Sequence, residues 1–254
     1  MSYNISLGLL NNTPLYRIMP LSRFEEMIKH RQNTLVKPFL WNDPCESICK
    51  HSIVTENNID YPLDVSHWYG QCWSMCEESA LMWQAFAPQI DNRRYVKIMA
   101  RNEKLTQNLK EESHLQIAVS EKIRYFLDDN NDQEEKVKEL INCHRWPKNF
   151  LNKGASYREL LPLYPLLTKR ILFKHEEEFR LLVFDKASSS DLFNYSFDVN
   201  TLVEEIVLDP WTPDDDVEKI TNKLRSLLIN EDINIKKSTL FSRDISKFCI
   251  KFKV

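Results

Sequence analysis

The chain has 254 residues, of which 43% are hydrophobic and 28% charged, and its net charge is -3. This composition is typical of a soluble globular protein and argues against a strongly basic nucleic-acid surface. The three glycines, Gly8, Gly70 and Gly154, lie more than fifty residues apart, which excludes Walker and Rossmann phosphate loops because both need several neighbouring glycines. Any bound nucleotide must therefore be held by side chains. We expect a single domain over residues 1–254, because this length can bury one sizeable core.

The sequence predicts a cytoplasmic protein with no membrane contact. Its longest apolar runs, such as Ile171–Phe173, are far too short to span a bilayer, and the first residues lack a basic region followed by an apolar core. The six cysteines are too few for a disulfide scaffold in a chain of this length. The pairs Cys45-x3-Cys49 and Cys72-x3-Cys76 are spaced more widely than most zinc knuckles. We therefore expect reduced cysteines and no bound metal.

Strands and helices mix along the chain without a regular alternation. Strands are predicted, from apolar alternation or apolar runs between turn residues, at Leu15–Met19, Tyr69–Ser74, Tyr95–Met99, Leu115–Phe126, within Lys174–Phe184, and at Ser196–Val199, Ile206–Leu208, Ile233–Lys236 and Phe248–Val254. Helices are predicted from a Ser22 cap to about Arg31, at Glu77–Phe86 and Asn102–Lys110, up to Cys143 after an acidic insertion, and from Asp214 to about Leu228. The fold class is therefore α+β, with a mixed, mainly antiparallel sheet and flanking helices.

Two of these segments carry specific expectations for burial. In the helix Glu77–Phe86 the predicted inner stripe contains Leu81, Met82, Ala85 and Phe86, with Trp83 near its edge. A loop between the first helix and the Tyr69 strand holds two prolines, an Asn-Asp pair and aromatic residues over positions 37–46. This composition predicts a shaped loop that leads into a short helix.

The stretch Lys174–Phe184 places charged groups at the entrance of a buried strand. Along a strand, Glu176, Glu178 and Arg180 share one face, whereas the alternate residues are apolar. After Arg180 both faces are apolar, which is typical of an interior strand covered on both sides. Ionised groups at such a boundary are costly unless they are paired or used in a site. A structural salt bridge and a functional site both fit this pattern.

Several motifs, in their order along the chain, resemble the bacterial domain of unknown function family numbered 2971 over about residues 14–241. The motifs are Leu15-Tyr16-Arg17, Asn42-Asp43-Pro44-x-Glu46, Tyr69-Gly70-Gln71-Cys72-Trp73-Ser74 with Leu81-Met82-Trp83, Glu176-x-Glu178-Phe179-Arg180, Leu208-Asp209-Pro210-Trp211-Thr212-Pro213 and Lys237-Ser238-Thr239-Leu240. Family members often carry Trp where Phe173 stands, so the wall of a pocket is expected to differ there. The resemblance brings no settled activity.

A second resemblance concerns layout. An Arg on an early strand, a Ser with aromatics on a middle strand and helix, and a late Glu-x-Glu strand are similar to ADP-ribosyltransferases, including phage-defence toxins that modify nucleic acid. This layout implies an NAD-consuming enzyme with a nucleic-acid or protein acceptor. Glu178 would face the oxocarbenium-like ribose that forms when the nicotinamide bond breaks, and Glu176 would activate the acceptor.

The remaining roles that this resemblance implies concern the binding of NAD, which is a substrate here. Arg17 would pair with the diphosphate through its planar fork. Ser74 would orient Glu178 or the ribose, and Arg180 would position the carboxylates. The predicted set is completed by the possible stacking partners Tyr16, Trp73 and Trp83 and by Asn42 and Asp43 of the proline-rich loop.

Two other functions stay open at the level of the sequence. A metal-dependent nuclease or hydrolase would use Asp43, Glu46, Glu176 and Glu178 as oxygen ligands, although Arg180 lies close to these carboxylates in sequence. A non-catalytic module would hold a small ligand or a partner peptide in the same aromatic pocket. A catalytic Glu178 predicts that Glu178→Gln loses activity and keeps the fold, whereas a structural ion pair predicts that it loses stability.

Overall fold

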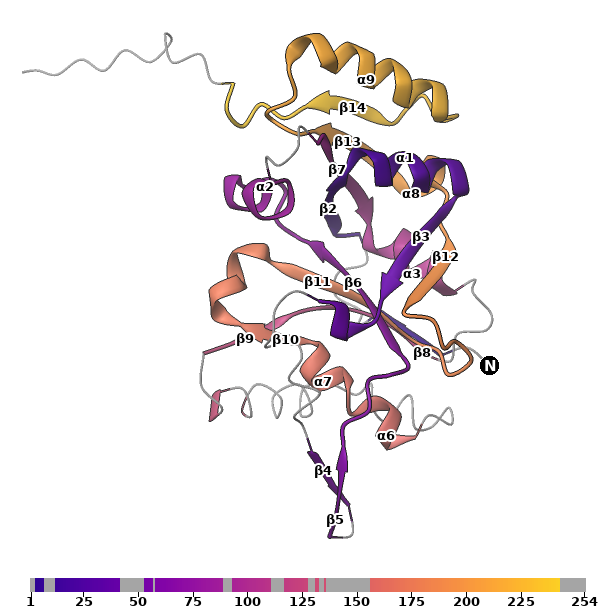
Figure 1. Ribbon diagram of the computed structural model, residues 1–254, viewed down its shortest axis with the longest axis vertical. Coiled ribbons are helices and arrows are strands. Elements are labelled where there is room, and N and C mark those ends of the chain that lie inside the picture. The colour runs from indigo at the N-terminus through magenta and orange to yellow at the C-terminus, as the bar shows by residue number, and fades with distance from the viewer. Residues whose placement is uncertain are drawn as a thin grey trace, which may run out of the picture.

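A ten-stranded sheet forms the centre of the molecule in the computed structural model (Figure 1). The structure describes residues 3–6, 12–41, 53–56, 58–88, 93–110, 117–127, 131–132, 135 and 156–242. The main path of the sheet runs β1 (Tyr3–Ser6), β8 (Ile117–Lys122), β11 (Glu178–Phe184), β6 (Trp68–Ser74), β2 (Pro14–Pro20), β7 (Tyr95–Arg101), β13 (Val203–Leu208) and β14 (Asn234–Lys237). The outer pairs β1–β8 and β13–β14 are parallel and the inner pairs are antiparallel, so the prediction of a mainly antiparallel α+β fold is confirmed.

Two further strands branch from this path, and two small sheets stand beside it. β3 (Gln32–Val36) pairs with both β6 and β12 (Leu192–Ser196). The hairpin β4 (Ile53–Glu56) and β5 (Ile59–Pro62) projects from the lower end of the molecule in Figure 1. β9 (Arg124–Phe126) pairs with β10 (Thr168–Arg170). The last pair positions the site because Lys169 of β10 bonds to Glu178, the first residue of β11.

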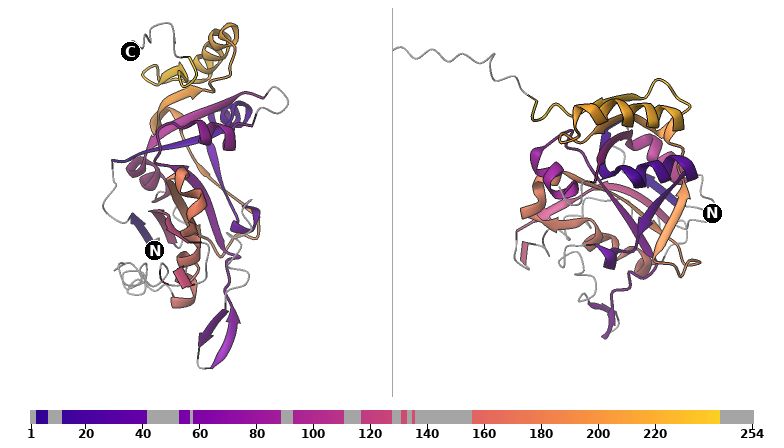
Figure 2. Two further views of the ribbon diagram at one scale, coloured as in Figure 1. Left: turned by 90° about the vertical axis from the view of Figure 1, so that its left-hand side faces the viewer. Right: turned by 45° about the horizontal axis from the view of Figure 1, so that its top comes forward.

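Helices cover both faces of the sheet. They are α1 (Leu21–His30), α2 (Ala80–Phe86), α3 (Asn102–Lys110), α6 (Tyr157–Leu160), α7 (Leu163–Leu166), α8 (Val199–Leu202) and α9 (Asp214–Leu227), with the 3-10 helices η1 (Pro38–Leu40) and η3 (Ile171–Glu176). Figure 2 shows α1 and α9 at the end of the molecule opposite to α6. None of the helices within the described ranges is long and apolar enough to cross a membrane.

The central strand β11 is buried along its whole length. Phe179, Leu181 and Val183 point into the larger core, which α1, α3, α8 and α9 cover. Leu182 and Phe184 point into a second core beneath α6 and α7. The prediction of an interior strand with apolar groups on both faces after Arg180 is therefore confirmed. Each fully buried aromatic or aliphatic side chain of this kind contributes roughly 1.5–3 kcal/mol to folding.

The sheet forks at β6. This strand pairs with β11 through all seven of its residues, from Trp68 to Ser74, but it pairs with β2 at Ser74 alone and with β3 at Gly70 alone. β2 and β3 therefore separate from each other beside the middle of β6. An opening bordered by three strands results, and it holds the site described below.

The indole of Trp41, just after η1, packs against Gly70 of β6. A methyl group added at Gly70 would overlap Trp41 Cζ2 and lie 2.9 Å from Leu182 Cδ2. The same indole stacks on the guanidinium of Arg180, whose Cζ lies 4.3 Å from the ring centroid. The absence of a side chain at Gly70 thus lets Trp41 approach the sheet and cover a buried arginine.

The structure corrects several predictions about the secondary structure. Ser22 lies inside α1 and caps nothing, because the helix begins directly after Pro20. α2 begins after Ser79, whose side chain accepts from the Leu81 N–H. The predicted strand Ser196–Val199 is wrong, because Asp198 caps a short helix there.

The predicted burial of α2 is also partly wrong. Trp83 is fully buried against Tyr95 and Val207, whereas Leu81 and Phe86 are exposed. The position at which the helix packs against the sheet, and not its apolar pattern, decides which face is buried. The predicted helix up to Cys143 lies largely outside the described residues, and the strand Phe248–Val254 lies wholly outside them.

Gly70→Ala should destabilise the protein by about 1–3 kcal/mol, the usual cost of overpacking a well-filled site. The added methyl must displace Trp41 and Leu182. Urea unfolding of Gly70→Ala should be compared with the same substitution in a Trp41→Ala background, where most of the overlap is gone and the cost should fall. An equal cost in both backgrounds would contradict the Trp41 contact.

Candidate functional site

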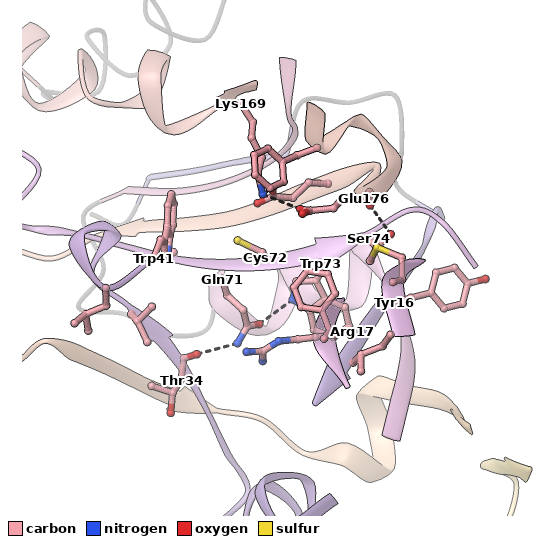
Figure 3. A pocket seen from close by; sticks show the side chains of 18 residues that line it. Tyr16, Arg17, Thr34, Trp41, Gln71, Cys72, Trp73, Ser74, Lys169 and Glu176 are labelled. Atoms are coloured by element: carbon pink, nitrogen blue, oxygen red, sulfur yellow. Dashed lines mark hydrogen bonds and ion pairs between the residues drawn. The ribbon is translucent and has the colours of Figure 1, made fainter. Parts of the chain in front are cut away.

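A cavity of about 420 Å³ occupies the fork between β2, β3 and β6 (Figure 3). Its volume lies in the range of pockets that hold drug-sized ligands. The predicted site residues that line it are Tyr16, Arg17, Trp73, Ser74, Glu176 and Glu178. These residues come from β2, β6, η3 and β11, so segments more than a hundred residues apart in the sequence meet around one opening.

Glu178 is the most constrained group of the cavity. It is the first residue of β11 and is 2% exposed. Its Oε1 accepts from Arg180 Nε at 2.6 Å, and its Oε2 accepts from Lys169 Nζ at 2.9 Å. Its backbone N–H donates to the Tyr125 hydroxyl at 2.7 Å. Both carboxylate oxygens are therefore fixed, and the Cys72 side chain is a further hydrogen-bonding partner of this carboxylate.

Lys169 links the two glutamates. It lies on β10, is 8% exposed, and donates from Nζ to Glu176 Oε2 at 2.7 Å as well as to Glu178. The same ammonium lies 4.7 Å from the ring centroid of Phe173. Figure 3 shows Lys169 and Glu176 on the opposite side of the cavity from Arg17. This lysine was not predicted from the sequence.

Glu176 does not lie on a strand, although its position two residues before Glu178 predicted one. β11 begins at Glu178, and Glu176 ends the 3-10 helix η3. Between them Glu177 adopts a left-handed conformation with φ 42°, which non-glycine residues rarely do. The prediction that Glu176 shares a strand face with Glu178 is therefore wrong. The turn at Glu177 still directs both carboxylates to Lys169.

Ser74 stabilises this turn. Its hydroxyl donates to the Glu176 backbone carbonyl at 2.6 Å and accepts from the Cys76 N–H at 3.0 Å. Ser74 was predicted to orient either Glu178 or the ribose; among the described residues its hydroxyl has no hydrogen bond to the Glu178 side chain, although Ser74 and Glu178 are paired in the sheet. Ser74 thus positions the backbone of the glutamate segment.

The two glutamates differ in their electrostatic environment. Burial alone would raise the pKa of Glu178, but the ion pairs with Arg180 and Lys169 lower it to about 2. Burial raises the pKa of Glu176 above its ordinary value, and the nearby Lys169 offsets only part of this effect. Glu178 is therefore ionised throughout the physiological range, whereas Glu176 is the easier of the two to protonate.

Arg17 brings a positive charge to the other side of the cavity. It is half-buried on β2. Within the part of the chain that the structure describes, its guanidinium has one hydrogen bond, from Nη1 to Asn33 Oδ1 at 3.3 Å, and no ion pair. A guanidinium has five donors, so most of those of Arg17, which lines the cavity, have no partner among the described residues. Asn33 in turn is fixed by the side chain of Gln71.

The amides of Asn33 and Gln71 connect the strands where the sheet forks. Gln71 Nε2 donates to the Thr34 carbonyl at 2.9 Å, and Gln71 Oε1 accepts from Trp73 Nε1 at 2.8 Å. Asn33 Nδ2 donates to the Tyr195 hydroxyl at 3.1 Å. Both amides are buried. This network holds β3 beside β6 and fixes the Trp73 indole at the floor of the cavity.

Aromatic side chains form much of the remaining lining, namely Tyr16, Trp41, Trp73, Phe86 and Phe173. The Tyr16 ring is also packed against the buried Lys97, whose Nζ lies 5.2 Å from its centroid. Planar rings of this kind suit the stacking of a heterocyclic ligand.

Two other predicted site residues, Trp83 and Arg180, do not line this cavity. Trp41 and Trp83 were the two predicted candidates for the wall; Trp83 is fully buried next to a small neighbouring cavity, and Trp41 lines the main one. Arg180 is 0% exposed and donates from Nη1 to the Leu166 carbonyl at 2.7 Å. It contacts Glu178 from outside the cavity lining, which agrees with the predicted role of positioning the carboxylates. Asn42 and Asp43 lie outside the described residues, as do Cys45, Glu46 and Cys49.

The structure assigns contacts to residues that sequence reasoning did not place. The only signal for Lys169 was a basic Lys-Arg pair before an apolar turn, and charged pairs of this kind are usually solvated. Asn33 carried no signal. Among the residues described, no group of three or more His, Cys, Asp or Glu side chains has the arrangement of a metal site.

No family model matches the chain and no curated protein matches it, so the resemblance to family 2971 stays a prediction. The chain is similar to solved structures of Thermus sp. 2.9 DarT. The complex with NAD+ has 12% identity and a TM-score of 0.40, with 89% of this chain and 96% of that chain covered. The complex with ADP-ribosylated ssDNA has 11% identity and a TM-score of 0.40, with coverage of 94% and 98%. For the carba-NAD+ complex the values are 10%, 0.38, 91% and 97%.

The lowered pKa of Glu178 predicts acid sensitivity. A carboxyl with a folded-state pKa of about 2 and an ordinary value of 4.5 contributes roughly 3 kcal/mol of stability above pH 4.5, which is lost as the pH falls toward 2. The free energy of unfolding, measured in urea between pH 7 and pH 2, should fall by roughly that amount more in wild type than in Glu178→Gln.

Glu121→Gln is the matched control for this measurement. Glu121 is buried on the neighbouring strand β8 and does not line the cavity. Burial raises its pKa, so its contribution to the pH dependence has the opposite sign. An equal fall in the free energy of unfolding between pH 7 and pH 2 for wild type and Glu178→Gln would contradict the ion pairs described above.

Proposed function

We propose that the protein binds NAD in this cavity and breaks the bond between nicotinamide and ribose, as an ADP-ribosyltransferase or NAD glycohydrolase. The observation that supports it most is the distribution of charge. A guanidinium without a carboxylate partner among the described residues lies on one side of the cavity, and an ionised, buried carboxylate lies on the other. In NAD, the anionic diphosphate would pair with this guanidinium, and the cationic nicotinamide ring would lie near this carboxylate.

Charge balance favours an anionic ligand. Lys169 and Arg180 compensate the two glutamates, and Arg17 then leaves one net positive charge at the lining. In a chain without a glycine-rich loop, a planar guanidinium is well suited to bind a diphosphate. The aromatic walls supply the stacking surface for the rings.

The reaction needs a negative charge that is fixed before the bond breaks. As nicotinamide leaves with the bonding electron pair, positive charge develops on the ribose, and a preorganised carboxylate stabilises it. Glu178 fits because both oxygens are held in place and its pKa of about 2 keeps it ionised. Glu176, with its raised pKa, is suited to accept the proton of the attacking hydroxyl or water.

The same contacts disfavour the use of Glu176 and Glu178 as metal ligands. The Lys169 ammonium occupies the position between the two carboxylates, where a divalent cation would have to bind. A site that binds NAD without turnover remains the principal alternative, because a neutralised acid pair also suits a binding module.

Purified protein incubated with NAD should release nicotinamide, measured by chromatography. Glu178→Gln should lower the rate by roughly a hundredfold or more, as for the loss of a main electrostatic stabiliser. Arg17→Met should act mainly on KM, by about 10- to 100-fold, because a hydrogen bond to a charged group contributes about 1.5–3 kcal/mol. Labelled NAD with added protein, RNA or DNA would identify an acceptor.

Glu25→Gln serves as the control variant. Glu25 is buried and pairs with Lys223 at 2.6 Å where α1 meets α9, away from the cavity, so the substitution removes a glutamate ion pair and should leave turnover unchanged. Because Glu178 is also a buried structural partner, its variant must be assayed at a temperature at which circular dichroism shows it folded. Normal turnover by folded Glu178→Gln would overturn the assignment. NAD binding without nicotinamide release by wild type would establish the binding module instead.

A further inference from the structure

We propose that Lys169 is a positioning residue that keeps Glu176 and Glu178 ionised side by side in the cavity, so that one carboxylate faces the ribose and the other is ready to accept a proton. The inference rests on the proposed function and extends it. It assigns the lysine a part in catalysis through the ion pairs that couple the two carboxylates to one ammonium.

The geometry requires the two carboxylates to be close. Both accept from the same Nζ, at 2.7 Å and 2.9 Å, so their two bonded oxygens can be no farther apart than these distances combined. All three side chains are buried, with exposures of 8%, 10% and 2% for Lys169, Glu176 and Glu178. At such a separation in a buried site, two carboxylates would not both stay ionised without a cation between them.

Other groups face this acid pair, and they do not substitute for Lys169. They are Arg17, Cys72, Ser74, Tyr125, His175 and Arg180. Arg180 bonds to Glu178 from behind the strand, and the Tyr125 hydroxyl bonds to a backbone N–H. The Lys169 ammonium bonds to both carboxylates. Its loss should therefore protonate Glu176 first, since burial already raises the pKa of that carboxyl.

The first test is the pH profile of nicotinamide release in Lys169→Met, compared with wild type and Lys169→Arg. In Lys169→Met the acid limb of kcat should move up by at least one pH unit, and kcat at pH 6 should fall tenfold or more with KM changed less than threefold. Lys169→Arg should restore the acid limb because it returns a cation. Glu176→Gln lacks the proposed proton acceptor and should turn over slowly, and in that background Lys169→Met should shift no acid limb, because a single carboxylate has no like charge to repel it.

The second test does not depend on turnover. Glutamate carboxyl carbons labelled with carbon-13 can be titrated by NMR in wild type and in Lys169→Met. One carboxyl should titrate at a higher pH in the variant, and Glu176→Gln in that background should remove this signal. Lys97→Met is the control for loss of a buried ammonium, since Lys97 is 4% exposed but donates to the Glu77 backbone carbonyl. It should leave the Glu176 titration unchanged.

The two tests separate the two proposals. A shifted titration in Lys169→Met with no NAD turnover by wild type would support the role of Lys169 and refute the proposed reaction. Turnover by wild type with an unshifted acid limb and an unshifted titration in folded Lys169→Met would overturn the role of Lys169 alone. Should Lys169→Met fail to fold, Lys169→Gln carries the same comparison, because it keeps a hydrogen-bond donor while removing the charge.

Discussion

The site and much of the central sheet depend on the pairing of Glu178 with Arg180 and Lys169. β11 is buried on both faces, so the charges of Glu178 and Arg180 on this strand are tolerated only because each is paired. Removing one partner from a buried pair commonly costs 3–5 kcal/mol, since the other charge stays desolvated and uncompensated. The carboxylate that faces the cavity is therefore also a structural element of the strand. A loss of stability in a Glu178 variant is expected whether or not this residue is catalytic, so unfolding alone cannot separate the two roles.

The cavity exists because the sheet does not close beside β6. β2 and β3 each pair with this strand at a single residue, and the side chains of Gln71 and Asn33 connect the strands across the opening. A side-chain network can hold strands apart at a fixed distance while leaving room for a ligand, which a continuous ladder of backbone hydrogen bonds cannot do. Trp41 completes the wall, and it covers Arg180 at the same time. Trp41 therefore contacts both the cavity and the arginine that pairs with Glu178.

Charge is distributed unevenly around this opening. The acid pair is compensated by Lys169 and Arg180, whereas Arg17 contacts a neutral amide among the residues described. For the ligand proposed above, this asymmetry would direct the anionic group toward Arg17. The acid pair is buried, and electrostatic effects on a reacting centre are larger in such surroundings than in water.

Features that depend on local periodicity and residue type could be predicted from the sequence alone. The strands at Leu15–Met19, Tyr69–Ser74 and Tyr95–Met99, the helix at Asn102–Lys110 and the interior character of β11 followed from alternation and apolar runs. The unusual charges at Arg17 and Glu178 were also visible in the sequence, because charged groups next to buried strands need a partner or a use.

Which side chains meet in the site became clear only from the three-dimensional arrangement of the strands. Lys169 lies nine residues before Glu178, and nothing in that spacing predicts that one ammonium bonds to two glutamates across a 3-10 helix and a left-handed residue. The choice of Trp41 over Trp83 for the wall depends on where a loop and a helix pack against the sheet. Asn33 can bond to Arg17 and Gln71 only because β3 meets β6 and β12 where the sheet forks. These contacts are set by packing between segments far apart in the chain, and local sequence patterns carry no information about such packing.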